Sequence, residues 1–277
     1  MDQIKKAIER AKANAASAIA LAGERQTEPK PALGADNWQL AARPRAQALN
    51  VSHLHLERSR IVAHLPGTSA SMSFDLLRTR ILQFMWSKGL STLVVTSPTG
   101  ACGKTVTSIN LGFSMARLES GHTVLVDLDL RKPQISNYLG IRPGSDIFGV
   151  LSGKTALADA LVSLDVAGPR LSILPALTSA ERPSEMVASQ EVKNLVKSLV
   201  KEFEKCIVVF DMPPLLFADD LISFLPSVDA VLLVVAAGQS TEDEVAECLR
   251  MIPEDKLVGL VLTKSDEKQR SSYYGYS

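Results

Sequence analysis

Residues 93–105 read LVVTSPTGACGKT, an apolar run followed by a glycine-containing turn and the triplet Gly103-Lys104-Thr105. The apolar run predicts a buried strand, and residues 107–117 predict a helix behind the turn. This arrangement is typical of phosphate-binding sites. Backbone N–H groups of the turn and of the helix N-terminus bind phosphate oxygens, a lysine neutralises their charge, and a hydroxyl binds Mg²⁺. Pro98 stands where the usual G-x-x-x-x-G-K-[ST] pattern has its first glycine. The residues that we predict to surround the phosphates are Gly100, Ala101, Cys102, Gly103, Lys104, Thr105 and Val106.

Two later strands are also predicted to end in acidic residues. Asp127 and Asp129 lie in VLVDLDLRKP, residues 124–133, and Asp211 lies in IVVFDMPP, residues 207–214. Alternation along a strand places Asp127 and Asp129 on the same side, at the edge of the sheet where phosphates would lie. Carboxylates there can bind Mg²⁺ or accept a proton from an attacking hydroxyl.

The remaining pattern predicts an α/β fold, a doubly wound three-layer parallel sheet with its ligand crevice at the carboxyl ends of the strands. Apolar runs at 92–96, 123–126, 171–174, 206–210, 230–235 and 257–262 predict strands buried on both faces. Helices are expected near 74–87, 104–119, 156–163, 188–203, 219–226 and 241–251.

Composition places limits on the class of protein. The chain has 277 residues, with 30 Lys plus Arg against 30 Asp plus Glu, so no global charge favours nucleic acid as a partner. The cysteines lack the spacing of a metal site or a disulfide framework. No secretory signal is visible, and the longest apolar run, 230–237, is far shorter than a membrane span. We therefore expect a cytoplasmic protein whose membrane association depends on a partner.

The chain divides into four predicted segments. Residues 1–22 have apolar residues at helical spacing and predict an amphipathic helix, and residues 23–71 have the composition of a linker, with a short strand expected around 60–64. Residues 72–266 form the predicted nucleotide-binding domain. Residues 267–277 form a tail that contains Tyr273, Tyr274 and Tyr276. Because Ser and Gly surround these phenols, we interpret them as phosphate acceptors and not as core residues.

In this order, these motifs resemble the bacterial tyrosine kinases (BY-kinases) of polysaccharide export, which are P-loop NTPases with Walker A, A′ and B motifs and a tyrosine-rich C-terminus. The resemblance covers residues 73–277. The opening IKKAIER, residues 4–10, and the closing YYGY, residues 273–276, are similar to stand-alone autokinases encoded in exopolysaccharide loci associated with exosortase sorting. The resemblance implies ATP and Mg²⁺, autophosphorylation between copies, a membrane chain-length (co-polymerase) protein as activating partner, and a cognate tyrosine phosphatase.

The resemblance also implies roles for single residues. Lys104 matches the phosphate-binding lysine, Thr105 the Mg²⁺ hydroxyl, and Asp127 the general base. Asp129 and Asp211 match the metal-organising carboxylates, Arg131 the arginine of the second box, and Asp220 a secondary acid. Family loops read Gly-Glu-Gly-Lys-Ser/Thr where this chain has residues 101–105, ACGKT. Met72 and Asp75 stand where the family's Glu-x-x-Arg-x-x-Arg oligomerisation motif has Glu and Arg.

Three other interpretations stay open at this point. A positioning or partitioning ATPase would share the fold without phosphorylating protein, although the loop lacks the second lysine of those relatives. A GTPase is suggested by residues 262–266, LTKSD, but not by the acidic motifs. A catalytically weak scaffold of the export machinery is suggested by the loop changes, although Lys104, Asp127, Asp129 and Asp211 are all present.

Overall fold

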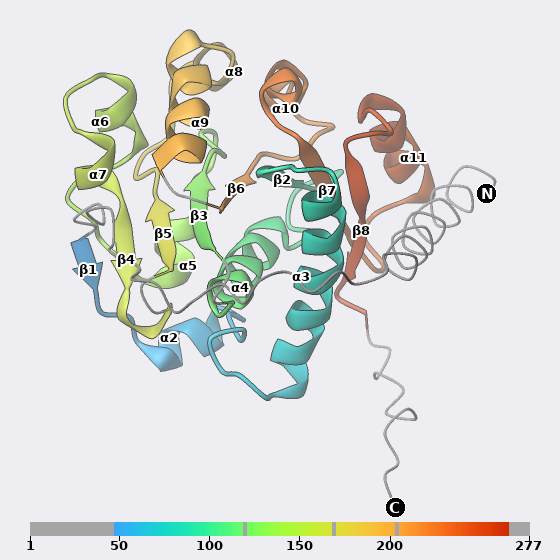
Figure 1. The fold of residues 1–277 in the computed structure, drawn as a ribbon. Coiled ribbons are helices and arrows are strands. Elements are labelled where there is room, and N and C mark those ends of the chain that lie inside the picture. Colours follow the sequence, from blue (N-terminus) through green and yellow to red (C-terminus); the bar gives the residue numbers. More distant parts are fainter. Residues whose placement is uncertain (1–46, 119–120, 168–169, 203–204, 266–277) are drawn as a thin grey trace, which may run out of the picture.

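The computed structural model describes residues 47–118, 121–167, 170–202 and 205–265, and the segments 1–22 and 267–277 lie outside these ranges. In the described part, one eight-stranded sheet carries helices on both faces (Figure 1). The strands are β1 (Gln47–Leu49), β2 (Thr92–Thr96), β3 (His122–Asp127), β4 (Val162–Leu164), β5 (Leu171–Leu174), β6 (Cys206–Asp211), β7 (Ala230–Ala236) and β8 (Leu257–Thr263). The helices are α2 (His53–Arg58), α3 (Ser69–Ser87), α4 (Lys104–Ala116), α5 (Ile135–Leu139), α6 (Ile147–Leu151), α7 (Leu157–Ala160), α8 (Pro183–Val187), α9 (Gln190–Glu202), α10 (Asp220–Phe224) and α11 (Glu242–Met251).

The strand order is β1-β4-β5-β3-β6-β2-β7-β8, and all neighbours pair in parallel except β4 and β5. Central strands β2, β3 and β6 are neighbours, with Asp127 at the end of β3 paired in register with Asp211 at the end of β6. Both carboxylates therefore reach the same edge of the sheet. The expected doubly wound α/β fold is confirmed, but the sheet is mixed and not wholly parallel.

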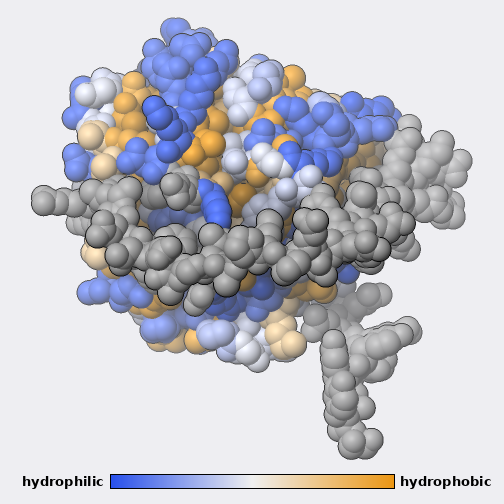
Figure 2. Space-filling model, viewed as in Figure 1, coloured by the Kyte–Doolittle hydropathy of each residue, from blue (hydrophilic) through white to orange (hydrophobic). Residues whose placement is uncertain are grey.

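Alternation along the strands divides the core between two layers. Val94 and Val126 pack with α6, α9, α10 and α11 on one face, whereas Leu93 and Leu125 pack with α2, α3, α4 and α5 on the other. This explains why the strands are apolar at every position: each side of the sheet is covered. Figure 2 shows hydrophilic residues on the outside of α8 and α9, as expected for helices with one buried face.

Residues 47–71 differ from the linker and the strand near 60–64 that we predicted. They contain β1, α2 and the first turn of α3, and Leu56 and Ile61 are fully buried. Asn110 of α4 replaces the strand partner: its Oδ1 accepts from the N–H of Val62 at 2.7 Å and of Ala63 at 2.9 Å. The backbone N–H groups of this segment are therefore hydrogen-bonded to a side chain that is remote in the sequence. The local sequence pattern could not predict this conformation.

The predicted helix at 156–163 is wrong in its second half. Helix α7 ends at Ala160, and Val162–Leu164 form β4, which pairs antiparallel with β5. Val162 and Leu164 are buried and Ser163 between them is less so, which is the alternation of a strand. Among the described residues, no helix has the length and apolar character needed to cross a bilayer.

Candidate functional site

The loop between β2 and α4 has the backbone shape of an anion-binding turn. Gly103 has a φ of 90° and Ala101 a φ of 60°, both in the left-handed region, and Lys104 begins α4. Alanine at position 101 therefore adopts a conformation that costs about 1 kcal/mol relative to glycine. Gly100, by contrast, lies outside this region of φ.

Two side chains that the sequence analysis did not identify hold this loop from neighbouring strand ends. The Gln239 Nε2 group, after β7, donates to the carbonyl of Gly100 at 2.7 Å. The hydroxyl of Thr263, at the end of β8, donates to the carbonyl of Cys102 at 2.6 Å. Cys102 itself is fully buried, so it is a packed loop residue.

Lys104 lies between two of the predicted carboxylates. Its Nζ is 2.7 Å from Asp129 Oδ2 and 3.4 Å from Asp211 Oδ2. Burial opposes the charge of the lysine, but the negative charges of Asp211 and Asp129 outweigh it and raise the pKa of Lys104. Lys104 therefore stays charged at the centre of the site.

Asp211 is fully buried and accepts hydrogen bonds from two hydroxyls of α4. The Thr105 hydroxyl donates to its Oδ2 at 2.6 Å, and the Ser108 hydroxyl to its Oδ1 at 3.1 Å. Burial raises the pKa of Asp211, although Lys104 counteracts this. Ser108 was not predicted, but it lies one helical turn after Lys104, so helical spacing behind the Gly-Lys-Thr triplet could have identified it.

The two carboxylate oxygens of Asp127 differ in their hydrogen bonds to the described residues. Its Oδ2 accepts from the N–H of Gln134 at 3.0 Å and of Ile135 at 2.9 Å. Its Oδ1 is buried and has no hydrogen-bond partner within the described ranges. Burial and the charge of Asp211 raise the pKa of Asp127 well above its ordinary value. A buried carboxylate oxygen without a partner is suited to receive a proton.

The oxygen donors at this edge fit Mg²⁺. Thr105 and Asp211 are in contact, and Asp129 lies across Lys104 from Asp211. In the described ranges, no group of three or more acidic, His or Cys side chains is arranged to hold a metal alone. Mg²⁺ takes oxygen ligands, and the phosphates of a substrate can supply part of its coordination.

Arg131 forms hydrogen bonds with residues of α8 and α10. Its Nε donates to Asp220 Oδ2 at 2.7 Å, and its Nη2 donates to the Ser184 hydroxyl at 2.7 Å. Asp220 is almost fully buried, so the guanidinium compensates its charge. The structure therefore links Arg131 to Asp220, and it brings Lys104, Asp127, Asp129 and Asp211 together without Arg131.

A pocket of about 730 Å³ opens beside the phosphate loop. Its walls include loop residues Cys102 and Gly103, the end of β8 at Thr263, and Arg58 and Arg60 from the segment that we predicted as linker. The volume lies within the range of small-molecule sites. Tyr273, Tyr274 and Tyr276 lie outside the described residues, so their interpretation as acceptors stays a prediction.

Comparison with known proteins finds relatives whose names describe tyrosine kinases. CapB of Staphylococcus aureus is 26% identical over 214 residues, which cover 76% of this chain and 91% of CapB. The tyrosine-protein kinase YwqD of Bacillus subtilis is 23% identical, over 80% of this chain and 92% of YwqD. The solved structure of the BceF tyrosine kinase domain has a TM-score of 0.64 at 25% identity and covers 79% of this chain and 91% of that domain.

The family described as the CobQ/CobB/MinD/ParA nucleotide binding domain matches residues 93–274, well over half of the chain. This range begins in β2, includes the phosphate loop and the three aspartates, and continues beyond β8. The chain belongs to the CobQ/CobB/MinD/ParA family of nucleotide-binding domains.

Proposed function

We propose that this chain is an ATP-dependent protein-tyrosine autokinase of exopolysaccharide production, which phosphorylates the tail tyrosines of a second copy. The observation that carries the proposal is the meeting of Lys104, Asp127, Asp129 and Asp211 at the ends of β2, β3 and β6. Similarity to tyrosine kinases over most of both chains supports this activity over others of the same fold.

In this proposal the phosphate loop amides and Lys104 hold the β- and γ-phosphates of ATP. Thr105, Asp129 and Asp211 would hold Mg²⁺, which supplies charge neutralisation on the phosphates when bound. The Lys104 ammonium group is paired with Asp129 at 2.7 Å, so phosphate oxygens would compete with that carboxylate for it. The pocket beside the loop would receive the nucleoside.

Asp127 would serve as the general base. The phenol oxygen of a tail tyrosine bonds to the γ-phosphorus, the bond to the β-phosphate oxygen breaks, and ADP leaves. The phenol proton passes to Asp127 Oδ1, the oxygen that has no partner within the described part. The amides of Gln134 and Ile135 fix the other oxygen, so the base is positioned before the acceptor arrives.

The partners and location follow from the same proposal. A cytoplasmic segment of a membrane chain-length (co-polymerase) protein would activate the kinase and keep it at the inner face of the plasma membrane. Self-association brings a second tail to the site, and a tyrosine phosphatase would reverse the modification. Asp75, where related kinases have arginine, binds the Ser114 hydroxyl at 2.6 Å and Arg78 at 3.1 Å, so α3 is tied to α4 within one copy.

The test is incubation of the full chain with Mg-ATP, followed by mass spectrometry of phosphotyrosine. We expect phosphate on Tyr273, Tyr274 or Tyr276, its loss in Lys104→Ala and in a chain truncated after Ser272, and its retention in Lys132→Ala. Lys132 is the matched control because it is an exposed lysine near the same edge of the sheet.

Two results would contradict the proposal. ATP hydrolysis without phosphotyrosine would indicate the switch ATPase. Neither activity, with the cytoplasmic segment of the partner present, would indicate a scaffold. Competition between ATP and GTP would decide whether the chain is a GTPase.

A further inference from the structure

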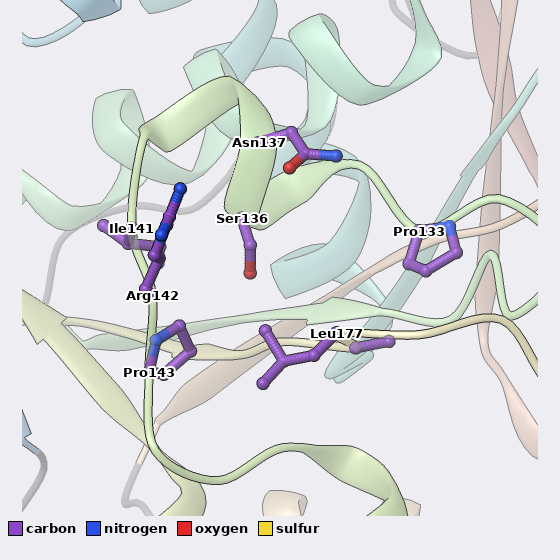
Figure 3. A pocket seen from close by; sticks show the side chains of 8 residues that line it. Pro133, Ser136, Asn137, Ile141, Arg142, Pro143 and Leu177 are labelled. Atoms are coloured by element: carbon purple, nitrogen blue, oxygen red, sulfur yellow. The ribbon is translucent and has the colours of Figure 1, made fainter.

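A second, smaller pocket lies at the same edge of the sheet, between α5 and the segment that follows β5 (Figure 3). Its volume is about 250 Å³. Its wall combines apolar residues with the polar residues Ser136, Asn137 and Arg142. The apolar wall residues are Pro133, Ile141, Pro143, Ala176 and Leu177.

One polar group in this pocket has no hydrogen-bond partner among the described residues. The Ser136 side chain is more than nine-tenths buried, and its hydroxyl forms no hydrogen bond with any residue of the described ranges. Figure 3 shows this hydroxyl pointing from α5 toward Leu177, into the pocket. A buried hydroxyl without a partner costs about 1–3 kcal/mol, and a ligand that supplies a hydrogen bond would remove that cost.

The wall is also anchored to the proposed base. Pro133 borders the pocket, and the next two residues, Gln134 and Ile135, donate their N–H groups to Asp127. On the opposite wall, the N–H of Leu177 donates to Asp146 Oδ2 at 3.2 Å, which fixes the segment after β5. A side chain seated here would therefore hold its peptide a few residues from the reacting centre.

We propose that this pocket binds a tyrosine side chain of the acceptor tail, next to the tyrosine that reacts; the inference rests on the proposed kinase function. A phenol combines an apolar ring with one polar end, which fits a wall where apolar residues lie beside the buried Ser136 hydroxyl. The exposed guanidinium of Arg142 at the rim supplies a planar cation for the face of the ring. The tail offers such neighbours in Tyr273, Tyr274 and Tyr276.

The occupant comes from a second copy. The pocket lies at β5, five strands from β8 in the sheet order, or about 24 Å at ordinary strand spacing. The eight to eleven residues from Ser265 to the tail tyrosines span at most about 27–40 Å when fully extended. A chain's own tail could reach the pocket only by crossing the strand ends that carry the phosphate site, whereas the tail of a second copy is not so restricted.

The test measures binding of a fluorescein-labelled peptide SSYYGYS, residues 271–277, to the full chain without ATP, by fluorescence anisotropy. A second peptide, SSFFGFS, lacks only the phenol hydroxyls. We expect Ser136→Ala to weaken the binding of SSYYGYS about five- to tenfold and to leave the binding of SSFFGFS unchanged, because only the first peptide loses a hydrogen bond. We expect Leu177→Ala to weaken the binding of both peptides. The control Leu54→Ala removes an exposed leucine outside the pocket and should leave the binding of both peptides unchanged.

In kinase assays with SSYYGYS as acceptor, Ser136→Ala should raise KM for the peptide by a similar factor, with kcat and KM for ATP unchanged. Unchanged KM for ATP also verifies that the variant is folded. The proposal would be overturned if Ser136→Ala weakened the binding of both peptides equally, or if it weakened the binding of neither. Displacement of SSYYGYS by millimolar inorganic phosphate would also overturn it, since the pocket would then bind an anion. Peptide binding without phosphorylation would contradict the kinase function and leave this site standing.

Discussion

Replacing Asp127 by asparagine should stabilise the protein while it removes phosphotransfer. Asparagine keeps an oxygen that can accept from Gln134 and Ile135, and it removes the negative charge that Asp127 carries beside Asp211. The NH₂ group of asparagine would replace Oδ1 without a partner among the described residues, but an unpartnered buried charge costs more than the about 1–3 kcal/mol of a neutral group. The exchange should therefore raise the free energy of unfolding by about 2 kcal/mol at pH 7.5. For a domain of this size, that corresponds to about 4–8 °C in Tm.

The pH dependence of this gain identifies its cause. Burial and Asp211 raise the pKa of Asp127, so the folded protein binds this proton more tightly than the unfolded chain does. The wild type therefore loses stability relative to Asp127→Asn as pH rises from about 4 through the folded pKa. The assay is urea unfolding of both proteins at pH 4.5 and 7.5, without nucleotide or Mg²⁺.

Asp129→Asn is the matched control, because Asp129 lies two residues further along and pairs with Lys104 at 2.7 Å. Its loss should destabilise the protein. A variant Asp127→Asn that is no more stable than wild type at pH 7.5, or one whose gain is equal at both pH values, would refute the reasoning.

Three further substitutions test local geometry. Ala101→Gly should raise the free energy of unfolding by about 0.5–1 kcal/mol because φ at this position is 60°, and urea unfolding with an unchanged midpoint would contradict this. Arg131→Gln should cost about 1–2 kcal/mol by leaving the buried Asp220 without its cation, and the double variant with Asp220→Asn should recover part of the loss; strictly additive losses in thermal unfolding would contradict the pairing. Gly140→Ala should lower Tm by several degrees, since φ is 67° and the added Cβ would lie 2.9 Å from the His55 ring; an unchanged Tm would show that α2 does not pack there.

The sequence predicted the centre of the sheet and most of the site because both depend on local pattern. Strand β2 has the bounds expected from its apolar run, and the positions of Asp127 and Asp211 follow from where two such runs end. The carboxyl ends of parallel strands lie at one edge of the sheet. A prediction of where the strands end therefore also predicts that residues at those ends lie close together.

The remainder could not be predicted because its partners are remote in sequence. Asn110 on α4 supplies the hydrogen bonds that order residues 60–63, and Thr263 on β8 holds the loop at Cys102. A helix–strand boundary such as that at Leu161 depends on whether β5 is available as a neighbour. None of these conditions leaves a periodic signal in its own segment.

The charges at the site favour the binding of a cation there. Asp127, Asp129 and Asp211 surround a single buried lysine, so the carboxylates outnumber the cation within this cluster. Burial makes such an excess costly, and the raised pKa values of Asp127 and Asp211 are its consequence. Mg²⁺ bound at Thr105 and Asp211 would reduce that excess and weaken the hold of Asp129 on Lys104. By this argument the metal and the nucleotide should bind cooperatively, because each makes Lys104 more available to the phosphates.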